Sequence, residues 1–328
     1  MAEPGPSAPT AAAEKPQEVA IRDVYGKTLA QLGEEREDIV VLDADLSGST
    51  RTVYFAKKFP HRFFNMGVAE QGMMDAAAGL ASTGKVVFAS SFAIFATGRA
   101  WESVRQSIAV PALNVKIVAT HAGITVGEDG TSHQMLEDIA LMRVLPNMTV
   151  VVPSDGPETA AAIRAVAERV GPCYVRLARA KFPVINPDPC PFTLGKARVL
   201  RRGRDATVVA AGIMVSMALK AAELLAGEGI EVGVVNLSTI KPIDRETLAE
   251  AARESGGIVT AEEHNIYGGL GGAVAEVLME DCPVPFVRFG MRDRFGVSGE
   301  AKALLAHFGL THVELADAVR EVVKKKKR

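Results

Sequence analysis

Short runs of β-branched residues alternate with stretches of helical periodicity through the first half of the chain. The apolar runs between Ile39 and Ala178 are IVVL, VVFAS, NVKIVAT, TVVVPS and YVRLA. Apolar residues recur at helical spacing in 19–34, 70–83, 95–110, 132–145 and 157–170. Strands this uniformly apolar are usually buried on both faces, so the pattern predicts βαβ units and a parallel sheet between layers of helices.

The pattern stops between Phe182 and Arg204, where four prolines predict a linker over 182–204. A second alternation follows, with the apolar runs ATVVAAG, IEVGVVNL, GIVTAEE and PFVRFG and with helical periodicity over 214–226 and 245–255. The sequence therefore predicts an α/β protein with two doubly wound domains, 19–181 and the smaller 205–323, each with a mostly parallel sheet.

Composition narrows the class of protein without naming a function. The chain has 328 residues, 48% of them hydrophobic and 23% charged, with a formal net charge of -2. There is no basic field to attract nucleic acid, and no apolar run reaches the roughly 18–20 residues that cross a bilayer. We expect neither nucleic acid nor membrane as a partner.

Both ends of the chain differ in composition from the two domains. Residues 1–18 are rich in Ala and Pro and lack the basic start and apolar core of a secretory signal, so we expect a disordered leader and a cytoplasmic protein. The tail KKKKR, 324–328, is expected to be a solvated end. The three cysteines are widely spaced and are expected to be free thiols.

The polar loop THAGITVGEDGTSHQ places His121, Asp129 and His133 after a predicted strand, where α/β proteins carry their sites. Two histidines and an aspartate could bind a metal, but their separation is not that of metal ligands, and we predict no metal site in this chain. The glycine-rich segments GGLGGAV and GEDG are not dinucleotide or P-loop motifs.

Three segments resemble the pyrimidine-binding domain of thiamine diphosphate enzymes, and of transketolases in particular. They are NMGVAEQGMMDAAAGLASTG, SSFAIFATGRAWESVRQS and the THAGITVGEDGTSHQ loop. TIKPID, EEHNIYGGLGGAV and FGVSG resemble the transketolase C-terminal domain, so the likeness covers about 19–323. It implies a pyrimidine-binding domain over 19–181, and over 205–323 a C-terminal domain without chemistry of its own.

The resemblance assigns cofactor contacts to three residues. Glu70 matches the glutamate that activates thiamine diphosphate by binding a nitrogen of its aminopyrimidine ring, and an apolar pocket makes proton sharing of that kind favourable. Phe92 and Phe95 match aromatic residues that form the pocket for this ring. Gly98 stands where many transketolases have a further aromatic residue.

The same match implies a site for phosphorylated sugars. Asp129 and His133 would bind sugar hydroxyls, and His133 would also assist proton movement. The phosphate would be held by two guanidiniums, an imidazole and a hydroxyl, which are suitable ligands for a phosphate monoester. These groups belong to Arg22, Arg179, His121 and Ser49.

The transketolase motif for the diphosphate and its metal, GDG followed by a downstream Asn, is absent. We therefore expect a separate N-terminal subunit to hold Mg²⁺ or another divalent metal, in a dimer of heterodimers that transfers two-carbon ketol units between sugar phosphates. The chain begins with its own Met, which favours a gene-encoded split enzyme.

Three alternatives remain open on the sequence. The chain could be half of a 1-deoxyxylulose 5-phosphate synthase, a 2-oxo acid dehydrogenase beta subunit or a non-catalytic regulatory subunit. The dehydrogenase subunits normally lack the GEDGxSHQ pattern. The joint presence of Glu70, Asp129 and His133 disfavours a silent subunit.

Overall fold

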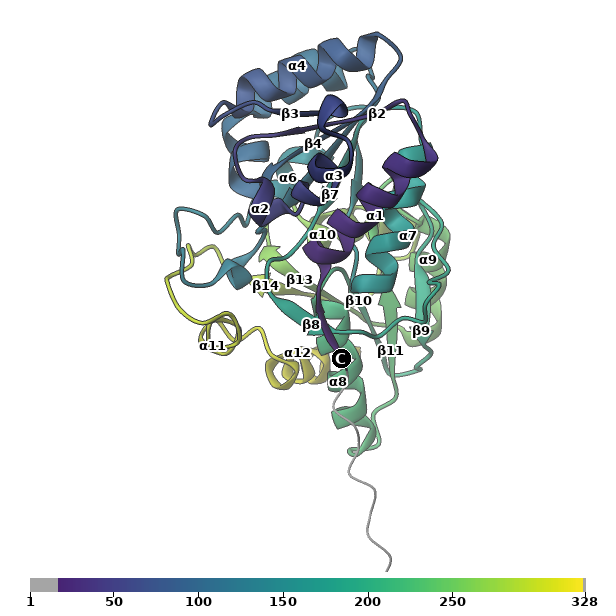
Figure 1. The fold of residues 1–328 in the computed structure, drawn as a ribbon. Coiled ribbons are helices and arrows are strands. Elements are labelled where there is room, and N and C mark those ends of the chain that lie inside the picture. The colour runs from purple at the N-terminus through teal and green to yellow at the C-terminus, as the bar shows by residue number, and fades with distance from the viewer. Residues whose placement is uncertain (1–16, 327–328) are drawn as a thin grey trace, which may run out of the picture.

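The computed structural model describes residues 17–326, which form two α/β domains (Figure 1). The first domain contains a seven-stranded sheet. Its strands are β2 (Ile39–Asp43), β3 (Phe63–Asn65), β4 (Val86–Phe92), β5 (Val115–Thr120), β6 (Thr149–Val151), β7 (Cys173–Arg176) and, from later in the chain, β12 (Thr239–Lys241). Their order is β12-β6-β7-β5-β4-β2-β3, and every neighbouring pair is parallel except β12 with β6.

Helices cover both faces of this sheet because its strands are apolar on both sides. One face carries α1 (Ile21–Glu35), α3 (Val53–Lys58) and α7 (Gly156–Glu168), which share a core cluster. The other face carries α4 (Glu70–Ser82), the π-helical turns η2 (Ile94–Arg99) and η3 (Val104–Ala109) around α5 (Trp101–Ser103), and α6 (Asp138–Arg143). The short elements α2 (Ser47–Thr50), η1 (Pro60–Arg62) and η4 (Ile124–Val126) lie in connections.

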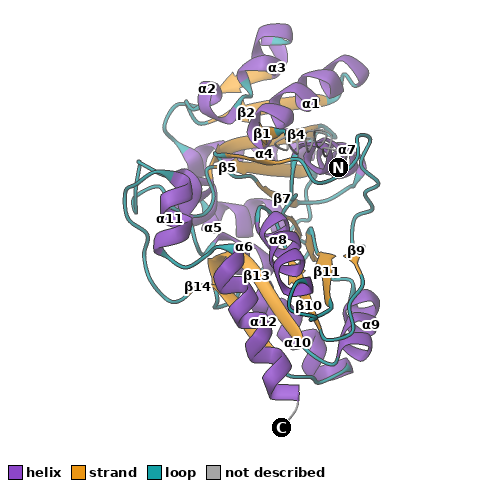
Figure 2. Cartoon of the chain, turned by 90° about the horizontal axis from the view of Figure 1, so that it is seen from below, coloured by secondary structure: helices purple, strands orange, loops and turns teal. Residues whose placement is uncertain are grey.

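The second domain has a five-stranded sheet of order β14-β13-β10-β11-β9, in which only β9 is antiparallel. Its strands are β9 (Arg198–Arg201), β10 (Ala206–Ala210), β11 (Val232–Asn236), β13 (Ile258–Asn265) and β14 (Phe286–Met291). Its helices are α8 (Met214–Ala226), α9 (Arg245–Ser255), α10 (Leu270–Asp281), α11 (Ala301–His307) and α12 (His312–Lys326). Figure 2 shows this sheet apart from the first, with α8 and α12 side by side.

The two domains are joined by backbone pairing as well as by side chains. β12 comes from the second domain but extends the first sheet. A separate pair, β1 (Glu18–Ala20) with β8 (Lys181–Pro183), joins the two ends of the first domain. At the junction the buried carboxylate of Glu158 accepts hydrogen bonds from Asn236 Nδ2 at 2.8 Å and Ser238 Oγ at 2.7 Å. The domains therefore share one continuous polar and apolar interface.

The predicted fold class, two mostly parallel α/β domains, is confirmed. The helix expected over 132–145 begins only at Asp138, because the preceding backbone turns back on itself with His133 N and Gln134 N donating to Gly130 O. The helix expected over 95–110 is mostly π-helical. The expected linker includes β9, which belongs to the second sheet.

The expected leader and tail lie partly outside the described residues. Residues 1–16 and 327–328 are not described, whereas Glu18 belongs to β1 and 324–326 continue α12. Within 17–326, no helix is both long and apolar enough to cross a membrane.

Candidate active site

The predicted site residues gather at the carboxyl edge of the first sheet. Phe92 ends β4, His121 directly follows β5, and Arg179 follows β7. Ser49 lies in α2 after β2, and Arg22 lies in the first turn of α1. Parallel strands bring their carboxyl ends to one edge, which explains how positions so far apart in the sequence come together.

Glu70 begins α4 and is buried, with an exposed fraction of 2%. Arg99 Nη1 donates to its Oε2 at 3.3 Å, and the Arg99 side chain is itself 54% exposed. Within the described residues this is the one hydrogen bond to the carboxylate, and a long one. Glu70 therefore combines burial with spare acceptor capacity, as a carboxylate that binds a ring N–H requires.

The two predicted aromatic contacts of the cofactor, Phe92 and Phe95, have different surroundings. The rings of Phe92 and Phe95 are nearly parallel, with centroids 6.1 Å apart, and Phe92 stacks on His121 at 3.7 Å. The Arg99 guanidinium lies 5.1 Å from the centroid of the half-buried Phe95 ring. Phe92 thus supports His121, while Phe95 is the more accessible ring. At the exposed Gly98, a Cβ would contact only Ile94 Cδ1, at 3.8 Å.

His121 is buried in a left-handed backbone conformation, with φ of 60°. Its Nδ1 lies 2.8 Å from Thr120 Oγ1, and its Nε2 lies 3.5 Å from Arg22 Nη1. Because a guanidinium can only donate, we assign the proton to Nδ1. Burial, then the charges of Arg22 and Arg179, lowers the pKa of His121 to about 3. The imidazole is therefore neutral at physiological pH.

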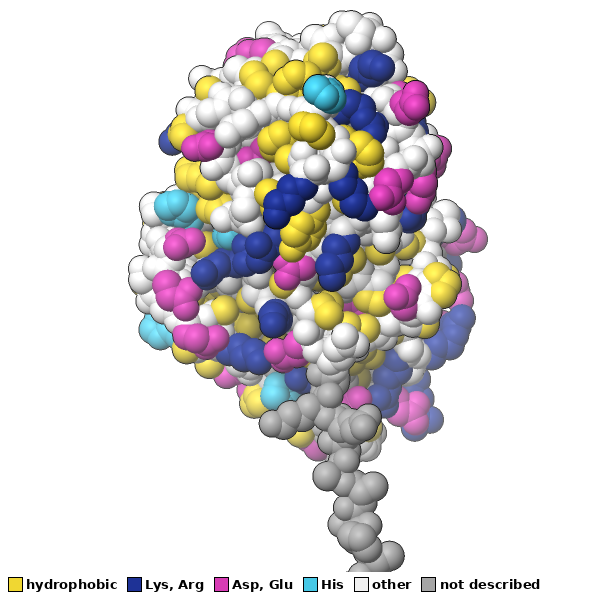
Figure 3. All heavy atoms as spheres, in the orientation of Figure 1, with side chains coloured by type: hydrophobic (Ala, Val, Ile, Leu, Met, Phe, Trp, Pro, Cys, Tyr) yellow, Lys and Arg dark blue, Asp and Glu magenta, His cyan; other side chains and the backbone are white. Residues whose placement is uncertain are grey.

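Two guanidiniums flank His121. Arg22 Nη1 also donates to Ser49 O at 2.9 Å, while Arg22 Nε is buried and has no partner among the described residues. Arg179 Nη1 donates to Val126 O at 2.6 Å and pairs with Glu128 at 2.8 Å. A buried donor without a partner is costly, so this cluster suits an incoming oxyanion. Figure 3 shows basic side chains across the middle of this face, around α1 and α2.

The loop 121–134 separates the two predicted hydroxyl ligands. His133 is half-buried, and its Nδ1 forms a hydrogen bond with Ser132 Oγ at 2.9 Å. Its ring meets the Phe95 ring edge-on, with the ring centroids 5.4 Å apart. Asp129 is exposed. The structure therefore brings His133 and His121 together with the aromatic pair, whereas Asp129 faces solvent.

The second domain holds this loop in place, which the sequence analysis missed. Glu263 Oε1, on β13, accepts from Thr125 N at 2.7 Å, and Thr131 Oγ1 donates to Gly296 O at 2.6 Å. Burial raises the pKa of Glu263 to about 7, and the charge of Arg176 opposes this rise. The available signal was the adjacent acidic pair that ends the otherwise apolar run GIVTAEE.

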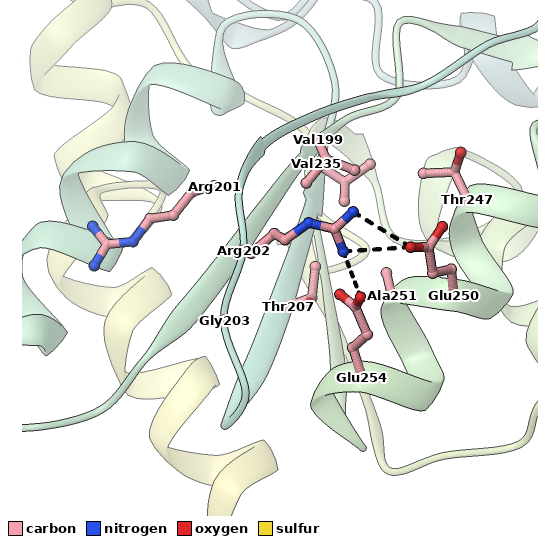
Figure 4. Close-up of a pocket in the computed structure, with 10 residues that line it drawn as sticks. All are labelled: Val199, Arg201, Arg202, Gly203, Thr207, Val235, Thr247, Glu250, Ala251 and Glu254. Carbon is pink, nitrogen blue, oxygen red and sulfur yellow. Dashed lines mark hydrogen bonds and ion pairs between the residues drawn. The ribbon is translucent and has the colours of Figure 1, made fainter.

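Metal-ligating and charged side chains elsewhere in the described chain are arranged differently. Within 17–326, no group of three His, Cys, Asp or Glu side chains is placed to hold a metal. A cavity in the second domain is lined by Arg202, Glu250 and Glu254, whose charges pair with one another (Figure 4). That cavity is formed by β9 and α9 and lies outside the site described above.

The fold and the site define a doubly wound protein that binds ligands at the carboxyl edge of its first sheet. Comparison with known families matches 17–184 to the transketolase pyrimidine-binding domain and 195–315 to the transketolase C-terminal domain. The chain belongs to the transketolase family, which confirms the resemblance noted in its sequence.

Two relatives and one solved structure match this chain over nearly their whole length. It is 53% identical over 308 residues to a protein of Methanocaldococcus jannaschii named as a transketolase C-terminal section, covering 93% of this chain and 96% of that protein. A 6-deoxy-6-sulfo-D-fructose transketolase subunit of Clostridium sp. is 43% identical over 312 residues, with 95% and 97% covered. A solved structure described as a split gene transketolase, inactive beta4 tetramer, is 52% identical with a TM-score of 0.87, covering 94% of this chain and all of that one.

Membership of this family implies dependence on thiamine diphosphate, and the residues present fit its pyrimidine end. Glu70 has a buried carboxylate with spare acceptor capacity, and Arg99, which donates to it, also lies 5.1 Å from the centroid of the half-buried Phe95 ring. The described residues offer no metal cluster for a diphosphate. Glu70 and Phe95 therefore suit the aminopyrimidine end of the cofactor.

Proposed function

We propose that this chain is one subunit of a two-subunit transketolase that transfers a two-carbon ketol unit from a ketose phosphate to an aldose phosphate. The observation that carries the proposal is the buried Glu70 carboxylate, whose donor Arg99 also lies over the Phe95 ring, at the same sheet edge as the Arg22 and His121 cluster. The proposed cofactor contact, Glu70, and the proposed anion site, at Arg22 and His121, thus lie at the same edge of the first domain.

When bound, thiamine diphosphate supplies the nucleophilic carbon that breaks and remakes the carbon–carbon bond of the sugar. Glu70 would hold the proton of the aminopyrimidine ring nitrogen, which the buried carboxylate can share. Phe95 would pack on the ring face, and Phe92 would support both Phe95 and His121. Glu70 is the residue of this chain on which turnover should depend most.

The cationic cluster would hold the phosphate of the sugar. Arg22 Nε is buried without a partner in residues 17–326, and Arg179 Nη1 lies near Gly127. To bind a phosphate oxygen, the neutral His121 would carry its proton on Nε2 and accept from Thr120 Oγ1 at Nδ1, without adding charge. His133 and Asp129 would bind hydroxyl groups nearer the reacting carbons, with His133 able to move a proton between oxygens.

A second subunit is required by this proposal, because the chain lacks the GDG motif for the diphosphate and its divalent metal. The similar solved structure is described as a beta4 tetramer and as inactive, which supports an assembly of this subunit without turnover. We infer that this chain also self-associates, and that activity needs a dimer of heterodimers containing an N-terminal, metal-holding subunit.

The test is a coupled assay of ketol transfer from xylulose 5-phosphate to ribose 5-phosphate, with thiamine diphosphate and Mg²⁺. It compares this chain, the partner subunit and the reconstituted complex. We expect turnover only in the complex. Turnover by this chain alone would remove the partner requirement.

The alternatives give different results in the same preparation. A complex that binds cofactor but transfers no ketol unit would move the assignment to 1-deoxyxylulose 5-phosphate synthesis or 2-oxo acid chemistry. An active complex in which Glu70→Ala is harmless would favour a regulatory role for this chain.

A further inference from the structure

Arg51 lies in the turn between α2 and α3, two residues after Ser49, in a left-handed conformation with φ of 74°. Helix α1 packs directly against it at Gly26. A Cβ on Gly26 would lie 2.5 Å from Arg51 O and 2.6 Å from Arg51 Cβ. The close approach of two backbones fixes the Arg51 side chain beside the first turn of α1, where Arg22 is found.

The guanidiniums of Arg51 and Arg22 bind adjacent peptide groups. Arg51 Nη1 donates to Gly48 O at 2.9 Å, and Arg22 Nη1 donates to Ser49 O, also at 2.9 Å. Arg51 Nε donates to Asp23 Oδ1 at 2.5 Å, which orients the group further. No acceptor for Arg51 Nη2 is present in residues 17–326. One nitrogen of a held guanidinium is therefore available to a ligand.

Three guanidiniums and an imidazole act on one another in this cluster. The charge of Arg51 contributes, after burial, to the lowered pKa of Arg22, and it also disfavours protonation of His121. Two of the three arginines are paired with carboxylates, Arg51 with Asp23 and Arg179 with Glu128, and both pairs are partly exposed. Positive charge thus exceeds negative charge, and a bound anion would relieve the repulsion.

We propose that Arg51 is a third guanidinium of the site for the terminal anion of the substrate, and that it selects a phosphate dianion over a sulfonate monoanion. The inference rests on the proposed function and names its substrate class more narrowly. A phosphate monoester carries roughly 1.5 to 2 negative charges at pH 7. A sulfonate offers three oxygens in the same geometry with one charge, so each additional cation favours the phosphate.

The experiment uses the reconstituted complex with fructose 6-phosphate and 6-deoxy-6-sulfofructose as donors. It measures kcat/KM for each, or the inhibition constant of the sulfonate where turnover is too slow. Arg51→Gln should lower kcat/KM for the phosphate about tenfold or more, and the sulfonate value about threefold or less, because the dianion feels the lost charge more strongly. Arg51→Lys should restore part of the preference, since it keeps the charge.

The matched control is Arg202→Gln, which removes an arginine paired with Glu250 and Glu254 in the second domain (Figure 4). It should leave the ratio of the two donors unchanged. Arg51→Gln with an unchanged ratio, or with the same loss as the control, would overturn the inference and leave the proposed function standing.

Calorimetry of inorganic phosphate binding to this chain alone distinguishes a failure of the proposed function from a failure of the inference about Arg51. If the wild-type complex transfers no ketol unit, the proposed function fails. Phosphate binding lost in Arg51→Gln and retained in Arg202→Gln would then still support the anion site. Equal phosphate binding by wild type and Arg51→Gln would overturn the inference independently of activity.

Discussion

Two ionisable side chains at the site, Glu70 and His121, are buried, and each has a long contact with a guanidinium. Arg99 lies 3.3 Å from Glu70 Oε2, and Arg22 lies 3.5 Å from His121 Nε2. Contacts of this length contribute little by themselves. Both side chains therefore have hydrogen-bonding atoms that remain available to a ligand, and substitutions at these two residues test this.

Glu70→Gln should lower turnover of the complex by about 100-fold or more, because an amide cannot take or return the proton that general acid–base catalysis requires. Thermal unfolding should change little, since the replacement has the same shape. The measurement is the coupled ketol-transfer assay together with a melting curve. Glu34→Gln, at an exposed carboxylate paired with Lys58, is the control. Activity of Glu70→Gln near that control would contradict the assignment.

The lowered pKa of His121 predicts that stability depends on pH. Its pKa falls from 6.5 to about 3 on folding, so below pH 6.5 the unfolded imidazole binds a proton that the folded one does not. The free energy of unfolding should therefore decrease as the pH drops from 6.5 towards 3, with up to about 1.4 kcal/mol per pH unit from this group.

Urea denaturation of this chain at pH 7, 5.5 and 4.5 measures that dependence. His121→Asn should show a shallower loss of stability, whereas His307→Asn, at an exposed position, should follow the wild type. Equal pH dependence in wild type and His121→Asn would show that His121 is not the group responsible.

At the scale of elements, the loop 121–134 depends on β13 of the other domain. Gly123 has φ of 81°, and a Cβ there would lie 2.3 Å from the Glu263 carboxylate. The same carboxylate accepts the hydrogen bond from Thr125 N. Close approach of a buried carboxyl group to the backbone therefore shapes the loop that carries His121 and His133.

Gly123→Ala should destabilise the chain by about 2 kcal/mol or more, because it combines an unfavourable backbone conformation with displacement of Glu263. Gly84→Ala is a matched control, with φ of 87° and open space around the added Cβ. It should cost about 1 kcal/mol, the backbone contribution alone. Chemical denaturation of both variants measures the difference. Equal losses would mean that Glu263 does not support the loop.

At the scale of the whole molecule, the two domains share a sheet and a buried polar junction. β12 is hydrogen-bonded to β6, and Glu158 accepts from Ser154 N at 2.7 Å in addition to its bonds from the second domain. Neither domain can separate without exposing these groups. Folding of one domain should consequently be coupled to folding of the other.

We expect one calorimetric unfolding transition for this chain, with no separate transition for either domain. Glu158→Ala should destabilise it by about 3 kcal/mol, because buried donors in both domains lose their acceptor. Glu246→Ala, at an exposed carboxylate beside Lys196, should stay within about 0.5 kcal/mol. Two transitions in the wild type would contradict the coupling.

The sequence by itself determined the repeating strand and helix pattern and the residue types from which the site is proposed. Apolar runs such as VVFAS and helices such as 214–226 are set by local periodicity, and the structure places them at those positions. Family motifs identified Glu70, His121 and Arg22 because chemistry of this kind depends on residue type. Local pattern could not reveal that Phe92 stacks on His121.

Only the tertiary structure decided which distant groups act together. The pairing of β12 with β6, the support of Thr125 by Glu263 and the position of Arg51 beside Arg22 each join segments that do not interact along the chain. Exposure, pKa and hydrogen-bond capacity arise from such long-range packing, because burial and neighbouring charges set them. Residue types therefore indicated the candidate chemistry, whereas long-range packing determined which of these residues lie together.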